Sequence, residues 1–275
     1  MLEPAIDSDI RTALGRAQCI EISGEDARAF AHAQFSCDVN SLQPLHWQWA
    51  AWLDHKGRVH ALMHLADTGD GRLIALLRGG DADRVSADLR RYLMRAHARI
   101  DPMHDRHVAV GPACPLHEVR LEADGVGFGY GDRSLWLERQ PRREDARRER
   151  AFRLAGIRSG WPSLPQGSEG ELLPPALGLE HLGAVVFEKG CYPGQEIAAR
   201  LHFRGGHKPR LAHLFSGVSP LGPGDRLTDF EGRASILDAV ETDEGFHALG
   251  VLEGIESSKF RYIDGFISVI SRFEA

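Results

Sequence analysis

Residues 189–200 read KGCYPGQEIAAR and hold the densest set of reactive side chains in the chain. The stretch combines a thiol, two glycines, an amide, a carboxylate and two cations. Nearby positive charge stabilises a thiolate, so Cys191 is a candidate reactive cysteine. Gly190 and Gly194 allow a close approach of the backbone to a ligand, or a positive φ. The residues alone leave open the alternative of a small buried cysteine in a turn.

Charge is concentrated at the same place. Gln195 and Glu196 can form paired hydrogen bonds with a flat polar heterocycle, and residues 189–210 carry five basic residues against one acidic residue. The whole chain has a net charge of −6. All of that excess lies from residue 211 onward, where 5 basic residues face 11 acidic ones. The positive segment suits a ligand with carboxylates, and the change in charge predicts a domain boundary near 210.

Length and composition indicate a globular protein. The 275 residues suggest two domains, and 43% apolar with 26% charged residues excludes wholesale disorder. No apolar run approaches the roughly 20 residues that a membrane helix needs, and the first residues lack a secretory pattern. We therefore expect a cytoplasmic protein without membrane partners. Its four cysteines are far apart and form no CxxC, which is typical of reduced thiols: Cys19, Cys37, Cys114 and Cys191.

The first hundred residues predict an α+β arrangement with a largely antiparallel sheet. Alternation predicts strands at 19–24, 47–53, 58–65 and 72–78, with a hairpin turn at 54–57. A helix is expected after the first strand, capped by Ser23, and another near Asp81. The order strand–helix–strand–strand–strand–helix favours an α+β fold.

The remaining patterns predict further strands and a small β domain. Strands are expected at 107–110 and 135–137, an arginine-rich helix at 142–154, and an ordered loop at 159–179. Beyond 210, short alternating stretches are separated by Gly, Asp and Pro turns, which favours a small barrel or sandwich. These stretches are 212–215, 235–240, 248–252 and 265–270.

Four other features favour structural roles. The glycines of 125–131 precede a strand-like segment, so they indicate a hairpin and not a dinucleotide loop. The fourteen histidines show no metal-site spacing, so no metal is expected. Trp47 and Trp49 share a strand face and are interpreted as packed sheet aromatics. Acidic residues dilute the arginines of 142–150, so direct nucleic-acid binding is not expected.

The octet KGCYPGQE closely resembles the signature of the YgfZ family. Five further segments are similar to conserved parts of that family, so the resemblance covers most of residues 17–215. They are ISGEDARAFAHAQFSCDV (22–39), LDHKGRV (53–59), FRLAGIRSGWP (152–162), LLPPALGLEHLGAVVFEKG (172–190) and AARLHFRGGHKPRL (198–211).

The resemblance implies a fold like the folate-binding aminomethyltransferase, or T-protein. Residues 1–210 would form a folate-binding body of two related α+β halves, with antiparallel sheets around a central pocket, and 211–275 a small C-terminal β-barrel. It also implies a protein that binds tetrahydrofolate or a one-carbon derivative. Such a protein supports the assembly, repair or activity of iron–sulfur enzymes, including ones that modify tRNA. Two alternatives stay open: a folate-dependent one-carbon transferase, and a non-catalytic folate-sensing module.

The resemblance also carries roles to individual residues. Cys191 corresponds to the functional thiol, and partners would be iron–sulfur enzymes or their assembly proteins. Ala17 falls where some members have tryptophan. Residues 121–137 do not reproduce a Gly- and Glu-containing stretch of the T-protein, so aminomethyl transfer from a lipoyl arm is not expected. The implied folate-binding residues are Phe152, Lys189, Gly190, Tyr192, Gly194, Gln195, Glu196 and Arg200.

Overall fold

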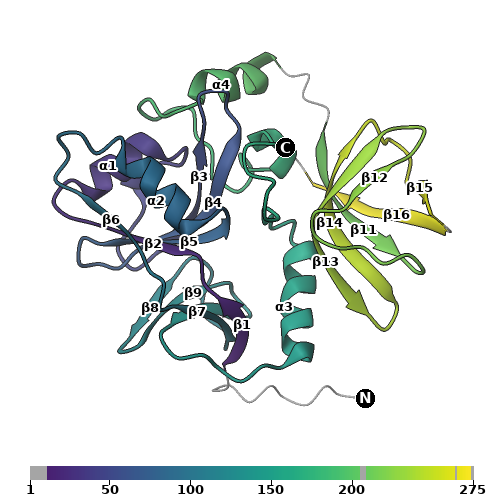
Figure 1. Ribbon diagram of the computed structural model, residues 1–275, viewed down its shortest axis with the longest axis horizontal. Helices are drawn as coiled ribbons and strands as arrows, with labels where there is room; N and C mark the ends of the chain where they lie inside the picture. The colour runs from purple at the N-terminus through teal and green to yellow at the C-terminus, as the bar shows by residue number, and fades with distance from the viewer. Residues whose placement is uncertain (1–10, 205–208, 264, 274–275) are drawn as a thin grey trace.

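The computed structural model describes residues 11–204, 209–263 and 265–273. Within these ranges the strands form three antiparallel sheets, two of five strands and one of six (Figure 1). The two five-stranded sheets lie together, and the six-stranded sheet lies beside them across helix α3 (Ala146–Arg158). The α+β fold with antiparallel sheets and a C-terminal barrel is confirmed.

The first five-stranded sheet has the order β3-β4-β5-β2-β6. Helices α1 (Ala27–Gln34) and α2 (Ala82–Arg90) pack on one face, and the opposite face joins the core shared with the second sheet. Because both faces are covered, the central strands are buried almost throughout and do not alternate between buried and exposed positions. The strands are β2 (Cys19–Ser23), β3 (Trp47–Leu53), β4 (Val59–Asp67), β5 (Leu73–Gly79) and β6 (Arg99–Pro102).

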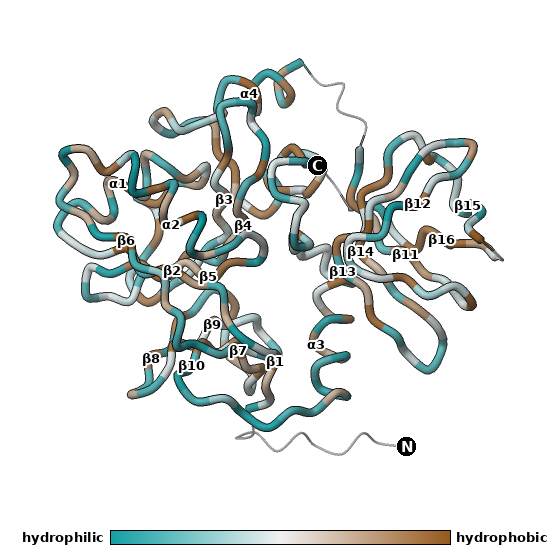
Figure 2. The backbone as a smooth tube through the Cα atoms, viewed as in Figure 1, coloured by the Kyte–Doolittle hydropathy of each residue, from teal (hydrophilic) through white to brown (hydrophobic). Residues whose placement is uncertain are grey.

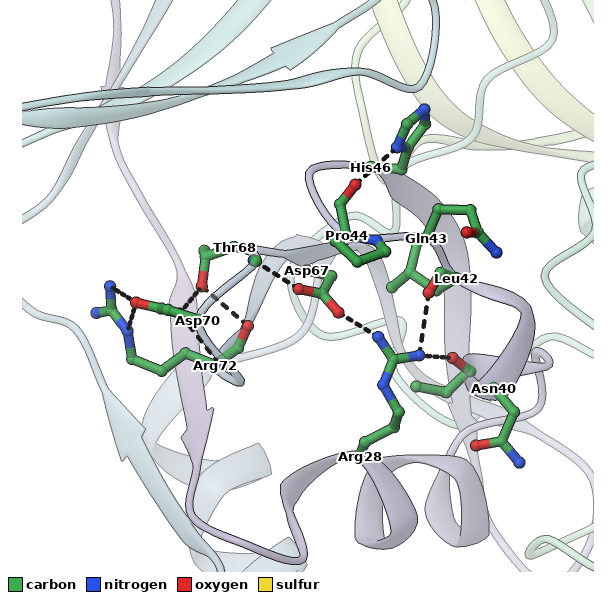
Figure 3. Close-up of polar contacts among 12 residues, drawn as sticks. Arg28, Asn40, Leu42, Gln43, Pro44, His46, Asp67, Thr68, Asp70 and Arg72 are labelled. Carbon is green, nitrogen blue, oxygen red and sulfur yellow. Dashed lines mark hydrogen bonds and ion pairs between the residues drawn. The ribbon is translucent and has the colours of Figure 1, made fainter.

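Polar contacts hold α1 to the far end of this sheet (Figure 3). The Arg28 guanidinium donates to the carbonyls of Val39 and Leu42 and pairs with the Asp67 carboxylate at the end of β4. Val39 begins the short 3-10 helix η1 (Val39–Ser41). These contacts join α1, the segment around η1 and the end of β4, which the sequence pattern alone does not connect.

The second five-stranded sheet has the order β1-β7-β10-β9-β8. The glycine-rich segment is a strand of this sheet, which confirms the predicted hairpin. A Cβ atom on Gly127 would lie 2.7 Å from the Trp136 ring, so glycine makes room for that tryptophan. The strands are β1 (Thr12–Arg16), β7 (His107–Gly111), β8 (Val119–Glu122), β9 (Gly125–Gly129) and β10 (Ser134–Glu138).

The C-terminal sheet is a nearly closed six-stranded barrel with the order β12-β13-β14-β11-β16-β15. Helix α3 packs against it, and the Arg153 guanidinium pairs with Asp238 of β13 at 2.5 Å. Figure 2 shows α3 as a mostly hydrophilic helix between the body and the barrel. The strands are β11 (Arg210–Ser216), β12 (Arg226–Thr228), β13 (Arg233–Thr242), β14 (Gly245–Glu253), β15 (Lys259–Tyr262) and β16 (Gly265–Arg272).

Some local predictions are wrong. Ser23 does not cap α1: it ends β2, and Asp26 precedes the helix. The arginine-rich helix begins four residues later than predicted, because the Asp145 side chain accepts from the amides of Arg147 and Arg148 and caps it there. The loop after α3 contains a short 3-10 helix, η2 (Pro174–Leu177), and the segment after the signature forms α4 (Gln195–Arg204).

Candidate functional site

The signature loop 189–194 packs against the tip of the β3–β4 hairpin through two glycines. Gly194 has φ +76°, and a Cβ atom there would lie 2.3 Å from the Asp54 carbonyl oxygen and 2.8 Å from Gly57 Cα. Gly57 has φ +73°, and its Cβ would lie 3.1 Å from the Ile197 side chain. The loop and the turn therefore approach each other only because both positions are glycine. Figure 1 shows the outcome, with α4 lying beside the tip of β3 and β4.

Lys189 anchors the loop to the end of α1. Its ammonium donates to the carbonyls of His32 at 2.5 Å, Phe35 at 2.6 Å and Cys37 at 2.7 Å. An ammonium has three donors, so these carbonyls use all of them. Burial lowers the pKa of Lys189, with nearby Cys37 and Asp38 opposing the shift. Lys189 thus positions the loop, and its predicted contact with folate stays a prediction.

Cys191 lies at the surface of this loop. All four cysteines belong to the described part of the chain, and the other three are buried. Burial raises the pKa of Cys37 to about 11 and that of Cys19 to about 12. Those two thiols are therefore protonated near neutral pH, whereas Cys191 is open to a partner.

The neighbouring signature residues divide into buried and exposed groups. Tyr192 is buried, and its ring centroid lies 5.1 Å from the Lys189 ammonium nitrogen. Burial raises the pKa of the Tyr192 phenol. Its hydroxyl has no hydrogen-bond partner among the described residues. The Gln195 amide donates to the Phe187 carbonyl at 3.3 Å. Gly190, Glu196 and Arg200 are exposed, and neither charged side chain pairs with another described residue.

Phe152 lies on α3 and lines a different cavity, of about 290 Å³. Its ring stacks on Tyr130 with centroids 5.8 Å apart and planes inclined by 23°. Trp161 meets Tyr130 edge to face at 4.7 Å. None of the residues that line this cavity belongs to 189–200. The structure therefore brings the signature residues together at the hairpin tip, whereas Phe152 lines a separate cavity.

The aromatic cavity is rich in arginine. Arg78, Arg133 and Arg153 line it, against Glu149 and Asp238. Arg153 lies within ion-pair distance of both acids, at 4.0 and 2.5 Å. The Nε atoms of Arg78 and Arg133 are buried and lack a hydrogen-bond partner among the described residues. The cavity thus carries an excess of positive charge, and two of the arginines that line it have a buried Nε atom without an acceptor in the described part of the chain.

A buried pair supports the cavity wall. The Tyr130 hydroxyl and His64 Nδ1 lie 2.8 Å apart, and His64 is fully buried. Burial, with Arg78 and His117, holds the pKa of His64 well below its usual value. His64 is therefore neutral, and its hydrogen bond with the hydroxyl orients Tyr130.

Sequence reasoning missed most of this cavity. Its walls come from β1, the end of β5, the β9–β10 turn, α3, the loop beyond it and β13. The sequence marks only individual residues of the cavity: Arg78 ends an apolar strand, and Trp161 belongs to the segment 152–162 that resembles the YgfZ family. No spacing rule links positions so far apart in the chain.

A larger cavity of about 620 Å³ lies between the body and the barrel. Two of the three described arginines that line it have carboxylate partners: Arg226 pairs with Glu171 at 2.6 Å, and Arg233 with Glu253 at 2.6 Å. The third, Arg58, donates to the Glu171 carbonyl at 2.6 Å. It offers fewer free donors than the aromatic cavity, which we take as the candidate ligand site. Within the described ranges, His, Cys, Asp and Glu side chains form no group of three or more that could hold a metal ion.

The fold is that of the aminomethyltransferases. The chain is similar to the glycine cleavage system aminomethyltransferase T from Bartonella henselae, with a TM-score of 0.70. The match covers 96% of this chain and 86% of that one, at 14% identity. That similarity establishes the T-protein-like architecture.

Sequence comparison points to a particular group within that architecture. The chain is 25% identical over 259 residues to the tRNA-modifying protein YgfZ of Shigella sonnei, and 25% identical over 264 residues to that of Escherichia coli O157:H7. Each match covers 82% of this chain and 79% of the relative. No family model matches the chain. These relatives confirm the resemblance to YgfZ. None of the described helices is both long and apolar enough to cross a membrane.

Proposed function

We propose that the protein binds a tetrahydrofolate in the aromatic cavity and supports iron–sulfur enzymes, including ones that modify tRNA. Cys191 acts as the functional thiol. The observation that carries the proposal is the wall of Tyr130, Phe152 and Trp161 beside two arginines with unpartnered Nε atoms. Flat rings suit the pterin, and the arginines suit its oxygen atoms and the glutamate carboxylates.

The size of the cavity agrees with a partly enclosed folate. At about 290 Å³ it is at the lower end of small-molecule sites, which range over roughly 300–1,000 Å³. The ring system fits such a volume, and the glutamate tail then extends through the mouth. His64 holds the Tyr130 hydroxyl from behind, so the wall is already oriented before the ligand enters.

The separation of Cys191 from the cavity favours an accessory protein over a transferase. A transferase would bring its nucleophile to the carbon unit on the folate, yet no signature residue lines the cavity. An exposed thiol beside a separate folate site suits contact with a partner enzyme. The printed name of the relatives, tRNA-modifying protein YgfZ, supports a link to tRNA modification, and iron–sulfur enzymes as partners are what the resemblance to the YgfZ family implies.

Calorimetric titration with tetrahydrofolate tests the proposal. We expect binding by the unmodified protein and at least about tenfold weaker binding by Phe152→Ala, because an aromatic contact contributes about 0.5–1.5 kcal/mol beyond the buried area. Phe30→Ala is the matched control: Phe30 is a phenylalanine of α1 that is 6% exposed, against 7% for Phe152, and it packs in the other core.

Four outcomes separate the alternatives. No folate binding by the unmodified protein would contradict the proposal. Equal weakening in Phe30→Ala would assign the effect to stability. Turnover of methylene-tetrahydrofolate with an added acceptor would favour the one-carbon transferase, and partner binding independent of Cys191 would favour the folate-sensing module.

A further inference from the structure

We propose that Arg133 makes the cavity selective for folates with an uncharged ring system, and against one-carbon forms whose ring system is cationic. The inference rests on the proposed function, because it needs a folate in this cavity. It concerns which chemical form of the ligand the site accepts.

The first observation is an aromatic cage that already holds a cation. The central guanidinium carbon of Arg133 lies 5.5 Å from the ring centroid of Phe152, 5.6 Å from that of Trp161 and 5.7 Å from that of Tyr130. Three rings at this distance attract a positive charge through their negative faces. Here the chain itself supplies that charge, so a ligand stacking on the rings meets a cation beside it.

The second observation is the charge balance of the lining. Arg153 takes both acids of the cavity, Glu149 and Asp238, as ion-pair partners. Arg133 pairs with Asp132 at 2.7 Å, but the side chain of Asp132 is 77% exposed, and water screens it. The Arg133 side chain is only 15% exposed. Together with Arg78, it leaves the interior of the cavity positive.

The third observation is the pair of unpartnered Nε atoms, on Arg78 and Arg133. A guanidinium that lines a cavity prefers a carbonyl oxygen or a carboxylate as its acceptor. Neutral reduced folates offer both, in the pterin carbonyl and the glutamate tail. A ring system with a delocalised positive charge is repelled by the same guanidinium that would donate to it.

Reduced folates differ in this respect. The ring system of 5-formyl-tetrahydrofolate is uncharged, whereas its cyclised derivative 5,10-methenyl-tetrahydrofolate carries a delocalised positive charge. The two differ little in size and share the glutamate tail, so they form a matched pair of probes. Without the arginine, the same three rings would attract the cationic form.

The test compares dissociation constants for the two probes by calorimetry at mildly acidic pH, where the methenyl cation persists. We expect the unmodified protein to bind the 5-formyl form about tenfold or more tightly. In Arg133→Gln this preference should fall about tenfold or reverse. Arg133→Lys should keep the preference because it keeps the charge. Arg139→Gln, at a side chain that is 62% exposed, should leave it unchanged.

Several results would overturn the inference. They are equal affinity of the unmodified protein for both probes, an unchanged preference in a folded Arg133→Gln, and a lost preference in Arg133→Lys. Because the first comparison uses the unmodified protein, it stands even where a variant fails to fold. Absence of binding of either probe to the unmodified protein would instead contradict the proposed function itself.

Discussion

Two residues of the signature, Lys189 and Gly194, have structural roles: they hold the signature loop against the rest of the protein. The sequence predicts glycine at 194 for close approach of the backbone, and the structure shows that the approaching group is the hairpin turn at Asp54 and Gly57. Lys189 likewise donates all three of its ammonium hydrogens to carbonyls at the end of α1. The signature loop is therefore held against α1 and the hairpin turn, and Cys191 is exposed on it.

Gly194→Ala should destabilise the protein by about 1–3 kcal/mol, because alanine strains a positive φ and its Cβ would meet the Asp54 carbonyl oxygen. Urea unfolding measures the change. Gly190→Ala is the matched control, since the nearest atom to its Cβ would be 3.9 Å away. Equal stability of the two variants would contradict the packing role of Gly194.

At the scale of elements, two neighbouring barrel strands share a buried histidine pair. His213 of β11 and His247 of β14 lie with Nε2 and Nδ1 2.9 Å apart. Burial, with His247 and Arg158 of α3, lowers the pKa of His213 to about 4. Burial and Arg158 also lower the pKa of His247, and Glu244 opposes that shift. Both rings are therefore neutral in the folded protein near pH 7.

Acid should weaken the barrel through this pair. Both folded pKa values lie below the unfolded value of about 6.5, so the unfolded chain takes up protons first as the pH falls. The contribution is complete above about pH 6.5 and is lost between there and about pH 4, up to about 3 kcal/mol. Urea unfolding at several pH values measures this slope.

A double variant, His213→Gln with His247→Gln, should lose stability less steeply over the same range. An unchanged slope would contradict the assignment to this pair. Titration of Asp70 does not overlap with this slope. Hydrogen bonds from Arg72 and Thr68 hold the pKa of Asp70 at about 2, so its contribution to stability is lost at lower pH.

At the scale of the whole molecule, the candidate thiol and the candidate folate cavity are separate. Figure 1 shows α4 beside the hairpin tip and α3 between the second sheet and the barrel. Helix α4 follows the loop that carries the exposed Cys191, and helix α3 carries Phe152, which lines the cavity. This arrangement allows a partner to contact the thiol while a folate occupies the cavity.

Cys191→Ala should therefore leave both the fold and the folate affinity unchanged, yet abolish rescue of an iron–sulfur enzyme defect in cells. Calorimetry, circular dichroism and a complementation assay measure the three properties. Cys114→Ala, at a buried cysteine, is the control for loss of a thiol. A fully active Cys191→Ala protein would contradict the role of the thiol.

The sequence predicts features that depend on neighbouring residues better than features that depend on pairing between distant segments. The strands beginning near 19, 47 and 107 are confirmed, because alternation and turn residues act within a few positions. The cap of α1 was wrong because the chain continues its strand through Ser23 and turns at Gly24, whose φ is +108°. The short strands β1, β6, β8, β12 and β15 were missed, since their stability comes from pairing partners and not from their own pattern.

By itself, the sequence determined the α+β class, the acidic barrel and the resemblance to YgfZ, because composition, periodicity and a contiguous motif are all local properties. Only the tertiary structure decided that Lys189 and Gly194 pack against α1 and the hairpin. It also decided that Arg133 lies among three rings drawn from a turn, a helix and a loop. Such contacts depend on how sheets and helices pack, and packing joins residues whose distance along the chain carries no periodic signal.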